Sequence, residues 1–341
     1  MNHITQKDIA QALNVSRITV SKALRNHPDI SDKMKKQVLE AVKTMGYTPN
    51  LIAKQLTTRK TLTLGIVVPD LENSFFSFAI DSIIDAAAAR DYHVILTVSR
   101  ENEQSERKNI ENLIEMRVDG LLVCVSQTTS DPEIFEYIKK FNTPLVFFDR
   151  VLEGLGFSTI VFNDRQGAID AMDEVILAGY KSIAHFAGYT SLSIGRERCE
   201  GYKSALLKNG IPIKNEWIIE AGYEVEDGYR SFMKLFASGN LPEIILAVND
   251  RVALGAYKAI RKCDLDIPGD IGIMGFGFSE TAQLFSPTLT IINQDPRKMG
   301  HVAVNTLIDE IIEGPLRNPL TMVIEEDFQW NTSVIRNPRT E

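Results

Sequence analysis

The sequence predicts a small all-α module at the N-terminus, followed by two α/β lobes that are each built on a parallel sheet. Residues 1–46 contain three short stretches of helical apolar periodicity, each preceded by a residue that caps helices well. From residue 61 onward, short apolar runs alternate with amphipathic stretches, and the same alternation begins again near residue 167. Strands that are apolar on both faces and alternate with helices form parallel sheets joined by right-handed crossovers.

The three N-terminal helices have recognisable start and stop signals. Thr5 opens the first helix with a capping-box pattern, and Asn14, which tolerates a left-handed backbone, closes it. Ser16 caps a second helix over residues 17–24, and Ser31 caps a longer third helix that ends at Gly46. The apolar positions expected to face inward are Ile9, Ala10, Leu13, Val20, Leu24, Met34, Val38, Leu39 and Val42.

The larger part of the chain is predicted to form two similar lobes. In the first set the expected strands are 62–69, 93–98, 120–125 and 145–148, and the helices are 75–89, 103–116 and 132–141. The second set has strands 182–187, 217–220, 243–248 and 271–276, helices 167–177, 198–209, 227–236 and 251–262, and a last strand-like run over 321–328. Ligands of parallel sheets bind beyond the carboxyl ends of the strands, so we expect a ligand cleft between the lobes.

The composition, with 44% hydrophobic and 24% charged residues, is that of an ordinary globular protein. The three cysteines, Cys124, Cys199 and Cys263, lie far apart without CxxC spacing, so we expect neither disulfides nor a metal site, and no motif indicates a cofactor. The N-terminus lacks the apolar core of a secretory signal, and no apolar run approaches ~18 residues. We therefore expect a cytoplasmic protein that has no membrane contact.

Charge is distributed unevenly along the chain. Residues 1–60 carry eleven lysines and arginines against four acids, a net charge of +7, whereas the whole chain has −8 and the remainder therefore −15. A basic module attracts nucleic acid, and an acidic body repels it. The N-terminal module is thus the candidate for DNA binding.

The spacing of three residues in the first two helices fits a helix-turn-helix. Ala10 is small enough for the helices to cross, Asn14 stands four residues later at the turn, and Val20 anchors the second helix after six more. Arg17 and Lys22 are left on the outer face, where basic side chains reach DNA. A generic three-helix bundle with a solvated basic face is the alternative.

Longer stretches resemble the lactose-repressor (LacI/GalR) family of bacterial transcription regulators. The similarity covers Ile4–Ala10, Val15–Leu24, Gly46–Asn50, Ala53–Leu56, Leu64–Asp70, Val118–Gly120, Gly201–Tyr202, Asn249–Gly255 and Gly275–Phe276. It implies a helix-turn-helix headpiece in residues 1–46, joined by a hinge helix and linker in 47–60 to a two-lobed, periplasmic-binding-protein-like α/β core with parallel sheets in 61–341. That core would bind effector and dimerise, with lobe 1 at about 61–162 plus 292–322 and lobe 2 at about 163–291 plus 323–341.

The resemblance implies that the second helix lies in the major groove of DNA, with Arg17, Ile18 and Lys22 facing the base edges. The two cations suit guanine O6 and N7, and the isoleucine offers an apolar surface to a thymine methyl group. The expected phosphate or sugar contacts are Ser16, Thr19, Ser21, Asn26, His27 and Tyr47, and Thr5 is a further candidate DNA contact. Ser16 and Ser31 are also expected to cap helices.

The hinge segment carries Leu56, which by the same resemblance would wedge between base pairs in the minor groove together with its copy from a second subunit. Asn50 and Ala53 would lie beside it. A helix of about seven residues is unstable without a partner, so we expect the segment to order on binding. Packing of Leu56 on its own domain is the alternative.

Candidate effector-binding residues follow the predicted strands of lobe 1. Asn73, Phe75 and Phe76 lie in the loop after the first strand, although a solvated loop with one core phenylalanine fits equally well. Asp149 and Arg150 directly follow the strand 145–148, where an acid and a base suit a hydroxyl-rich ligand. A surface salt bridge between them is the alternative.

In lobe 2, Arg198 matches the family arginine that reaches the effector, and Arg196 is a second candidate. Tyr223 corresponds to an aromatic residue that stacks on ligands in relatives, or it is a half-buried core tyrosine. The further candidates are Asn249 and Asp250, of which the second caps a helix, contacts ligand, or does both. One departure is Gly277, which stands where many relatives have an acid after the Gly-Phe pair.

These observations predict a ligand-responsive transcription regulator that represses genes of carbohydrate metabolism and binds a palindromic operator as a homodimer. The expected effector is a sugar or a sugar phosphate. Catalysis is not expected, because the five histidines are scattered and no nucleophile motif occurs. The alternative is a solute-binding or sugar-sensing protein without a DNA function, which has no use for a basic head.

Overall fold

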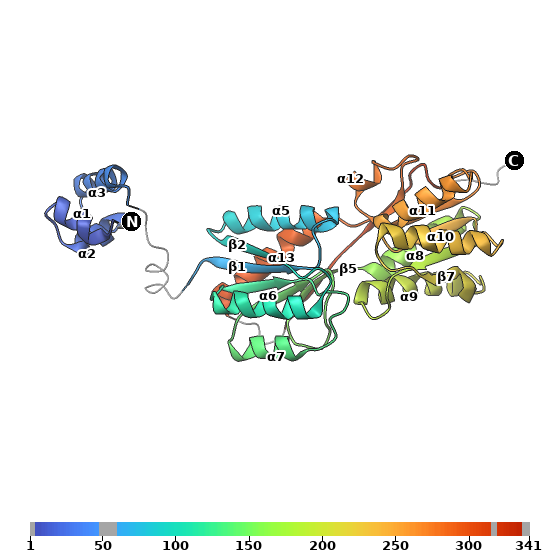
Figure 1. The fold of residues 1–341 in the computed structure, drawn as a ribbon, viewed down its shortest axis with the longest axis horizontal. Coiled ribbons are helices and arrows are strands. Elements are labelled where there is room, and N and C mark those ends of the chain that lie inside the picture. Colours follow the sequence, from blue (N-terminus) through green and yellow to red (C-terminus); the bar gives the residue numbers. More distant parts are fainter. Residues whose placement is uncertain (1–3, 48–59, 315–318, 336–341) are drawn as a thin grey trace. The chain divides into compact units, whose positions relative to one another are not determined.

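The computed structural model describes residues 4–47, 60–314 and 319–335, and the chain separates into two units, Met1–Thr61 and Leu62–Glu341. The first unit contains helices α1 (Gln6–Ala12), α2 (Arg17–Leu24) and α3 (Asp32–Met45), drawn in dark blue in Figure 1. Asn14 and Gly46 have φ angles of 52° and 69°, which are the left-handed conformations expected where α1 and α3 end. The three predicted helices and their ends are confirmed.

The headpiece core is small and is made by side chains of all three helices. Its buried members are Ile9, Ala10, Val20, Ala23 and Val38. The prediction that Leu39 faces inward is wrong, because its side chain is 56% exposed. It directly follows Val38, and adjacent residues of a helix point about 100° apart, so only one of the two faces the core.

Lobe 1 is built on a parallel sheet of the order β11-β5-β4-β3-β1-β2. Its strands are β1 (Thr63–Val68), β2 (His93–Val98), β3 (Gly120–Val123), β4 (Leu145–Phe148), β5 (Ser158–Phe162) and β11 (Thr321–Ile324). Helices α5 (Ser74–Ala88) and α13 (Pro296–Glu313) cover one face, and α6 (Glu103–Glu115) and α7 (Glu133–Lys140) cover the other (Figure 1). Ile66 and Val67 pack on opposite faces, as successive residues of a strand buried on both sides must.

Lobe 2 repeats this plan with a sheet of the order β12-β10-β9-β8-β6-β7. The strands are β6 (Ile183–Ala187), β7 (Ile218–Glu220), β8 (Ile244–Ala247), β9 (Gly272–Gly277), β10 (Thr290–Asn293) and β12 (Asp327–Gln329), and β12 pairs antiparallel with β10. Helices α8 (Asp164–Leu177) and α9 (Ser193–Lys208) pack on one face, and α10 (Val225–Ala237) and α11 (Asp250–Lys262) on the other. A 3₁₀ turn, η1 (Asn215–Trp217), and a short helix, α12 (Ser279–Ala282), complete the described elements.

The chain crosses between the lobes after β5, after β10 and after β11. The predicted single strand over 321–328 is wrong: Glu325 and Glu326 interrupt it, so β11 joins the sheet of lobe 1 and β12 joins the sheet of lobe 2. The lobe limits predicted at 291/292 and 322/323 fall inside β10 and β11. Each crossover therefore begins where a strand has ended.

Candidate functional site

The outer face of α2 in the headpiece carries the residues predicted to read DNA bases. Arg17 is exposed and the side chain of Ile18 is 69% exposed, whereas Val20 and Ala23 on the same helix are buried. An exposed isoleucine beside an exposed arginine has no role in the headpiece core. This arrangement leaves both side chains free to meet base edges.

Lys22 already has an acidic partner within the headpiece. Its Nζ lies 2.7 Å from Asp29, and the two side chains are 41% and 60% exposed. Such an exposed pair contributes at most about 1 kcal/mol, so a base contact by Lys22 requires only that a weak pair opens.

The predicted phosphate contacts have local structural roles. Ser16 caps α2 by accepting a hydrogen bond from the Thr19 amide at 3.0 Å. Ser21 accepts one from Arg25 at 3.0 Å, and the Asp29 amide donates to His27 at 3.3 Å. The remaining candidates are Thr5, whose amide donates to Asp8 at 2.7 Å, Asn26, which is exposed, and Tyr47, which packs partly on the headpiece core. Asn50, Ala53 and Leu56 lie outside the described residues.

The candidate effector site of lobe 1 centres on Asp149 and Arg150, directly after β4. Both are buried, so the alternative of a surface salt bridge between them is wrong. Arg150 Nη1 donates to Glu101 at 2.7 Å, and its guanidinium lies 5.0 Å from the ring of Tyr223 in lobe 2. Burial raises the pKa of the Asp149 carboxyl, and the adjacent guanidinium opposes that shift. A cation of one lobe thus faces an aromatic ring of the other.

Arg198 of α9 is the corresponding buried cation of lobe 2. Its Nε donates to Asp164 at 2.6 Å, and its Nη2 donates to Gln294 at 3.0 Å. Its Nη1 donates to the Val248 carbonyl at 2.5 Å, and the guanidinium lies 4.1 Å from the Phe276 ring centroid. All three guanidinium nitrogens of Arg198 therefore donate to protein acceptors.

Tyr223 is a buried residue whose hydroxyl group has no partner among the described residues. Its ring packs tightly on Gly188, and its hydroxyl group lies against Gly195, where an added Cβ would be 2.7 Å from the Tyr223 oxygen. Arg150 Nε and Ser193 Oγ are likewise buried without a hydrogen-bond partner in the described part of the chain. Buried polar groups are nearly always satisfied, so these atoms indicate where a polar ligand would bind.

The loop and helix candidates of lobe 1 have mainly structural roles. Asn73 caps α5 by accepting a hydrogen bond from the Phe75 amide at 3.0 Å. The Phe75 ring lies 6.2 Å from that of Phe162. Phe76 is buried in the lobe core, and the Arg150 guanidinium lies 6.0 Å from its ring centroid. Phe76 therefore packs beneath the Arg150 guanidinium as part of the core of lobe 1.

Asn249, and not Asp250, caps α11. Asn249 accepts a hydrogen bond from the Val252 amide at 2.8 Å, and Asp250 accepts one from the Thr281 hydroxyl at 2.8 Å. Gly277 adjoins this carboxylate, since a Cβ added to it would lie 3.2 Å from the Cβ of Asp250. The Asp250 carboxylate thus lies beside the position at which the resemblance leads one to expect an acid.

Direct ion pairs join the two lobes. Arg196, predicted to reach ligand, donates to Glu153 of lobe 1 at 2.6 Å. Arg251 of α11 donates to Asp70 of lobe 1 at 2.9 Å and also pairs with Glu224. These contacts are partly exposed, so they bias the arrangement of the lobes weakly.

Several residues of this site were not found from the sequence. Glu101, Asp164 and Gln294 accept hydrogen bonds from the predicted residues Arg150 and Arg198. Glu326 accepts one from Gln294, and Ser193 Oγ is a buried atom without a partner among the described residues. Asp164 and Gln294 follow β5 and β10, and recognition of those two strands would have pointed to both residues. Glu326 carries no local signal.

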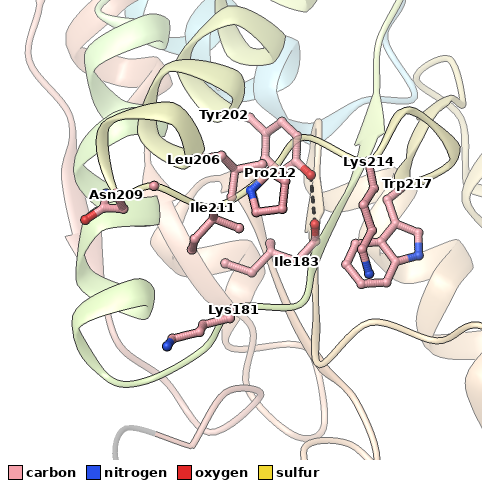
Figure 2. Close-up of a pocket in the computed structure, with 10 residues that line it drawn as sticks. Lys181, Ile183, Tyr202, Leu206, Asn209, Ile211, Pro212, Lys214 and Trp217 are labelled. Carbon is pink, nitrogen blue, oxygen red and sulfur yellow. Dashed lines mark hydrogen bonds between the residues drawn. The ribbon is translucent and has the colours of Figure 1, made fainter.

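A pocket of about 220 Å³ lies elsewhere in lobe 2, lined by residues from the start of β6, the end of α9 and the segment 210–217. In Figure 2 the ammonium group of Lys181 points away from the other lining residues, and Lys214 lies along Trp217, 3.7 Å from its ring. The pocket adjoins the amino end of β6, opposite to the strand ends that carry Arg150 and Tyr223. No set of polar groups converges in it, so we do not assign it the effector.

The described residues contain no group of three or more His, Cys, Asp or Glu side chains placed to hold a metal ion. No described helix is both long and apolar enough to cross a membrane.

Comparison with known proteins identifies both units. The family profile "Bacterial regulatory proteins, lacI family" matches residues 5–50, and "Periplasmic binding proteins and sugar binding domain of LacI family" matches residues 61–333. The chain belongs to the LacI family. It is therefore a DNA-binding transcription regulator and not an enzyme, which excludes the alternative of a sugar sensor without a DNA function.

Individual relatives agree with this assignment. The "Probable HTH-type transcriptional repressor ExuR" of Bacillus subtilis is 33% identical over 313 residues, which are 91% of this chain and 92% of that protein. The crystal structure of the lac repressor dimer bound to operator and the anti-inducer ONPF has a TM-score of 0.87 and 25% identity over 98% of this chain and 100% of that one. A LacI-family regulator from Enterococcus faecium with bound ribose has a TM-score of 0.69 and 26% identity, covering 80% of this chain and 98% of that one.

Proposed function

We propose that this LacI-family regulator is a repressor that binds a palindromic operator as a homodimer and responds to a small hydroxyl-rich effector. The observation that carries the proposal is the combination of two sites in one chain. Arg17 and Ile18 are exposed on α2. The Arg150 guanidinium of lobe 1 lies over the Tyr223 ring of lobe 2, and each of these side chains has a buried polar atom without a hydrogen-bond partner among the described residues. The genes controlled would be those of carbohydrate metabolism, and the protein would act in the cytoplasm.

A homodimer is supported by the surface of lobe 1. β2 pairs only with β1 among the described strands, so it is an edge strand of the sheet, and its Leu96 is 36% exposed. Ile84 on α5 and Leu71 before it are 45% and 42% exposed. Exposed edges and apolar side chains are the features that subunit contacts cover. A second copy on this surface would supply the second recognition helix that a palindrome requires.

The charge of the effector site favours a neutral ligand over a sugar phosphate. Every nitrogen of the Arg198 guanidinium already has a protein acceptor. Among the described residues Arg150 keeps a free Nε–H for a ligand oxygen, but its positive charge is already balanced by Glu101 and Asp149. A phosphate would need an uncommitted cation, whereas a hydroxyl group both donates and accepts. The carboxylates near the two guanidinium groups are Glu101, Asp149, Asp164 and Glu326. A neutral sugar fits this mixture of donors and acceptors.

We propose that the effector acts by changing the arrangement of the lobes. Arg150 and Tyr223 belong to different lobes, so a ligand between them binds one arrangement better than another. That change would shift the first lobes of a dimer and permit or prevent pairing of the hinge segments, including Leu56, on DNA. The coupling is between two sites through one bistable element.

The DNA part is tested by selecting duplexes from a random pool with the full-length protein at low ionic strength. We expect the enriched sequences to share an inverted repeat, because a dimer presents two recognition helices. Leu56→Ala should weaken binding to the selected duplex and leave effector affinity unchanged. A pool that shows no enrichment, or enrichment of one unsymmetrical half-site, would contradict the proposal.

The effector part is tested by thermal unfolding of the same protein with matched pairs of sugars and their phosphates. A ligand that binds the native state raises the midpoint of unfolding. We expect a neutral sugar to raise it and the corresponding phosphate to leave it unchanged. The reverse order would show that the carboxylates do not set the ligand class.

A further inference from the structure

The three segments that cross between the lobes contribute polar side chains to one cluster. Asp164 opens α8 directly after the first crossover, Gln294 lies between β10 and α13, and Glu326 lies between β11 and β12. Arg198 of α9 joins them from lobe 2. Residues more than a hundred positions apart are thereby joined at the point where the lobes hinge.

Gln294 is the centre of this crossover cluster. Its side-chain amide donates to Asp164 at 2.9 Å and to Glu326, and its carbonyl oxygen accepts from Arg198 at 3.0 Å. Arg198 also donates to Asp164 at 2.6 Å. Both amide hydrogens of Gln294 are committed, so the cluster has no spare donor for another anionic oxygen.

One oxygen of Glu326 has no hydrogen-bond partner in the part of the chain that the structure describes. This atom, Oε2, is buried, and it lies so close to the backbone of Gly167 that a side chain there would overlap it. The cluster contains two carboxyl groups, those of Asp164 and Glu326, and one guanidinium group. A buried anionic oxygen without a donor is costly, whereas a protonated carboxyl group is neutral.

The charged groups that act on Glu326 lie on α8, on α9 and on its own crossover segment. Burial and Asp164 raise the pKa of Glu326 to about 8, Arg198 opposes this, and Glu325 of the same crossover adds to it. Farther out, Glu197 of α9 raises the pKa of Asp164. Glu325 itself is exposed and accepts a hydrogen bond from Asn163 at 3.2 Å.

We propose that the crossover cluster is a proton-operated lock on the two lobes. When Glu326 carries a proton, the three crossovers stay joined through Gln294. When the proton leaves to solvent, two carboxylates share one guanidinium and one amide, and the anionic Oε2 must reach water. Because each member sits on a different crossover or lobe element, that separation changes the angle between the lobes.

The experiment measures the distance between spin labels on the two lobes of the full-length protein as a function of pH. Suitable label sites are the exposed residues Gln104 on α6 and Glu226 on α10, after the partly exposed Cys263 is replaced with serine. Labelled chains are mixed with excess unlabelled protein, so that distances between subunits do not contribute. The measurement needs neither DNA nor effector, so its failure leaves the proposed function standing.

With Glu326 intact we expect the distance distribution to change between pH 6.5 and 9.5 with a midpoint of about 8. Glu326→Gln, which is permanently neutral, should keep the low-pH distribution throughout. Glu325→Gln, the matched control on the same crossover, should keep the transition and move its midpoint only slightly to lower pH, because Glu325 makes the smallest contribution to the raised pKa of Glu326. A parent distribution that does not change with pH, or a Glu326→Gln protein that titrates like the parent, would overturn the lock. If Glu326→Gln fails to fold, Asp164→Asn should move the midpoint to lower pH, and an unmoved midpoint would equally overturn it.

Discussion

The charged residues of the headpiece are exposed or partly exposed, whereas those of the junction of the lobes, meaning Arg150, Arg198 and their hydrogen-bond partners, are largely buried. In the headpiece, Arg17 is exposed and Lys22 shares an exposed pair with Asp29. At the junction, Arg150 and Arg198 are each only 4% exposed, and they donate to partly buried Glu101 and buried Asp164. Exposed charges contribute little to stability, whereas removing one partner of a buried pair is costly. The charged residues of the headpiece can therefore serve DNA binding with little effect on stability, whereas those of the junction serve both ligand binding and stability.

The largest effect is expected when the junction loses a cation. Arg198→Ala leaves the Asp164 carboxylate buried without its guanidinium, which should lower the free energy of unfolding by about 3–5 kcal/mol. Urea unfolding of the full chain followed by tryptophan fluorescence reports this, because Trp217 and Trp330 both lie in the lobes. Arg165→Ala, an exposed control on α8, should cost less than about 0.5 kcal/mol. If Arg198→Ala and Arg165→Ala lowered the free energy of unfolding equally, the distinction between buried and exposed charges would be wrong.

The stability of the lobes should also depend on pH through Glu326. Its pKa is about 8 in the folded protein against an ordinary 4.5, so the folded state binds the proton more tightly and stability falls as pH rises between those values. Buried His185, with a pKa of about 4, has the opposite effect below pH 6.5, so the comparison is made above that pH. Between pH 6.5 and 9, Glu326→Gln should abolish a decrease on the order of 2 kcal/mol. An unchanged slope would place the titrating group elsewhere.

In the headpiece the expected effect is on binding alone. Arg17→Ala should weaken binding to a selected operator by about 1–3 kcal/mol, or roughly fivefold to 150-fold, because an exposed base contact is lost. Lys36→Ala, an exposed change on α3, serves as the control in a gel-shift titration. The unfolding of the lobes should be unchanged in both. A shared loss of lobe stability would show that the two regions are not separate.

The smallest effect concerns the departure at Gly277. Gly277→Asp would place a second carboxylate against Asp250, whose pKa burial already raises, and should cost about 1 kcal/mol more than Gly277→Asn. Urea unfolding of the two variants at pH 7 measures the difference. Equal free energies of unfolding would mean that a second carboxylate at the junction costs no stability, as is expected of an added charge on the headpiece surface.

The helices of the headpiece and the alternation of strands and helices in the lobes could be predicted from local sequence patterns. Thr5, Ser16, Asn14 and Gly46 mark helix ends through hydrogen bonds and φ angles that involve residues within about four positions. The first candidates of the junction, Asp149, Arg150, Arg198 and Tyr223, followed from strand ends and from the family resemblance. Local signals and a family pattern were sufficient for these residues.

The residues that complete the junction become apparent only in the folded chain. Asp164, Gln294 and Glu326 meet across sequence separations of 130 and 32 residues, and β11 and β12 divide one apolar run between two sheets. Whether a charge is buried, and beside which partner, depends on chain crossings that no short segment encodes. Burial is a property of the packed molecule, and it is burial that makes these carboxyl groups and guanidinium groups interact strongly.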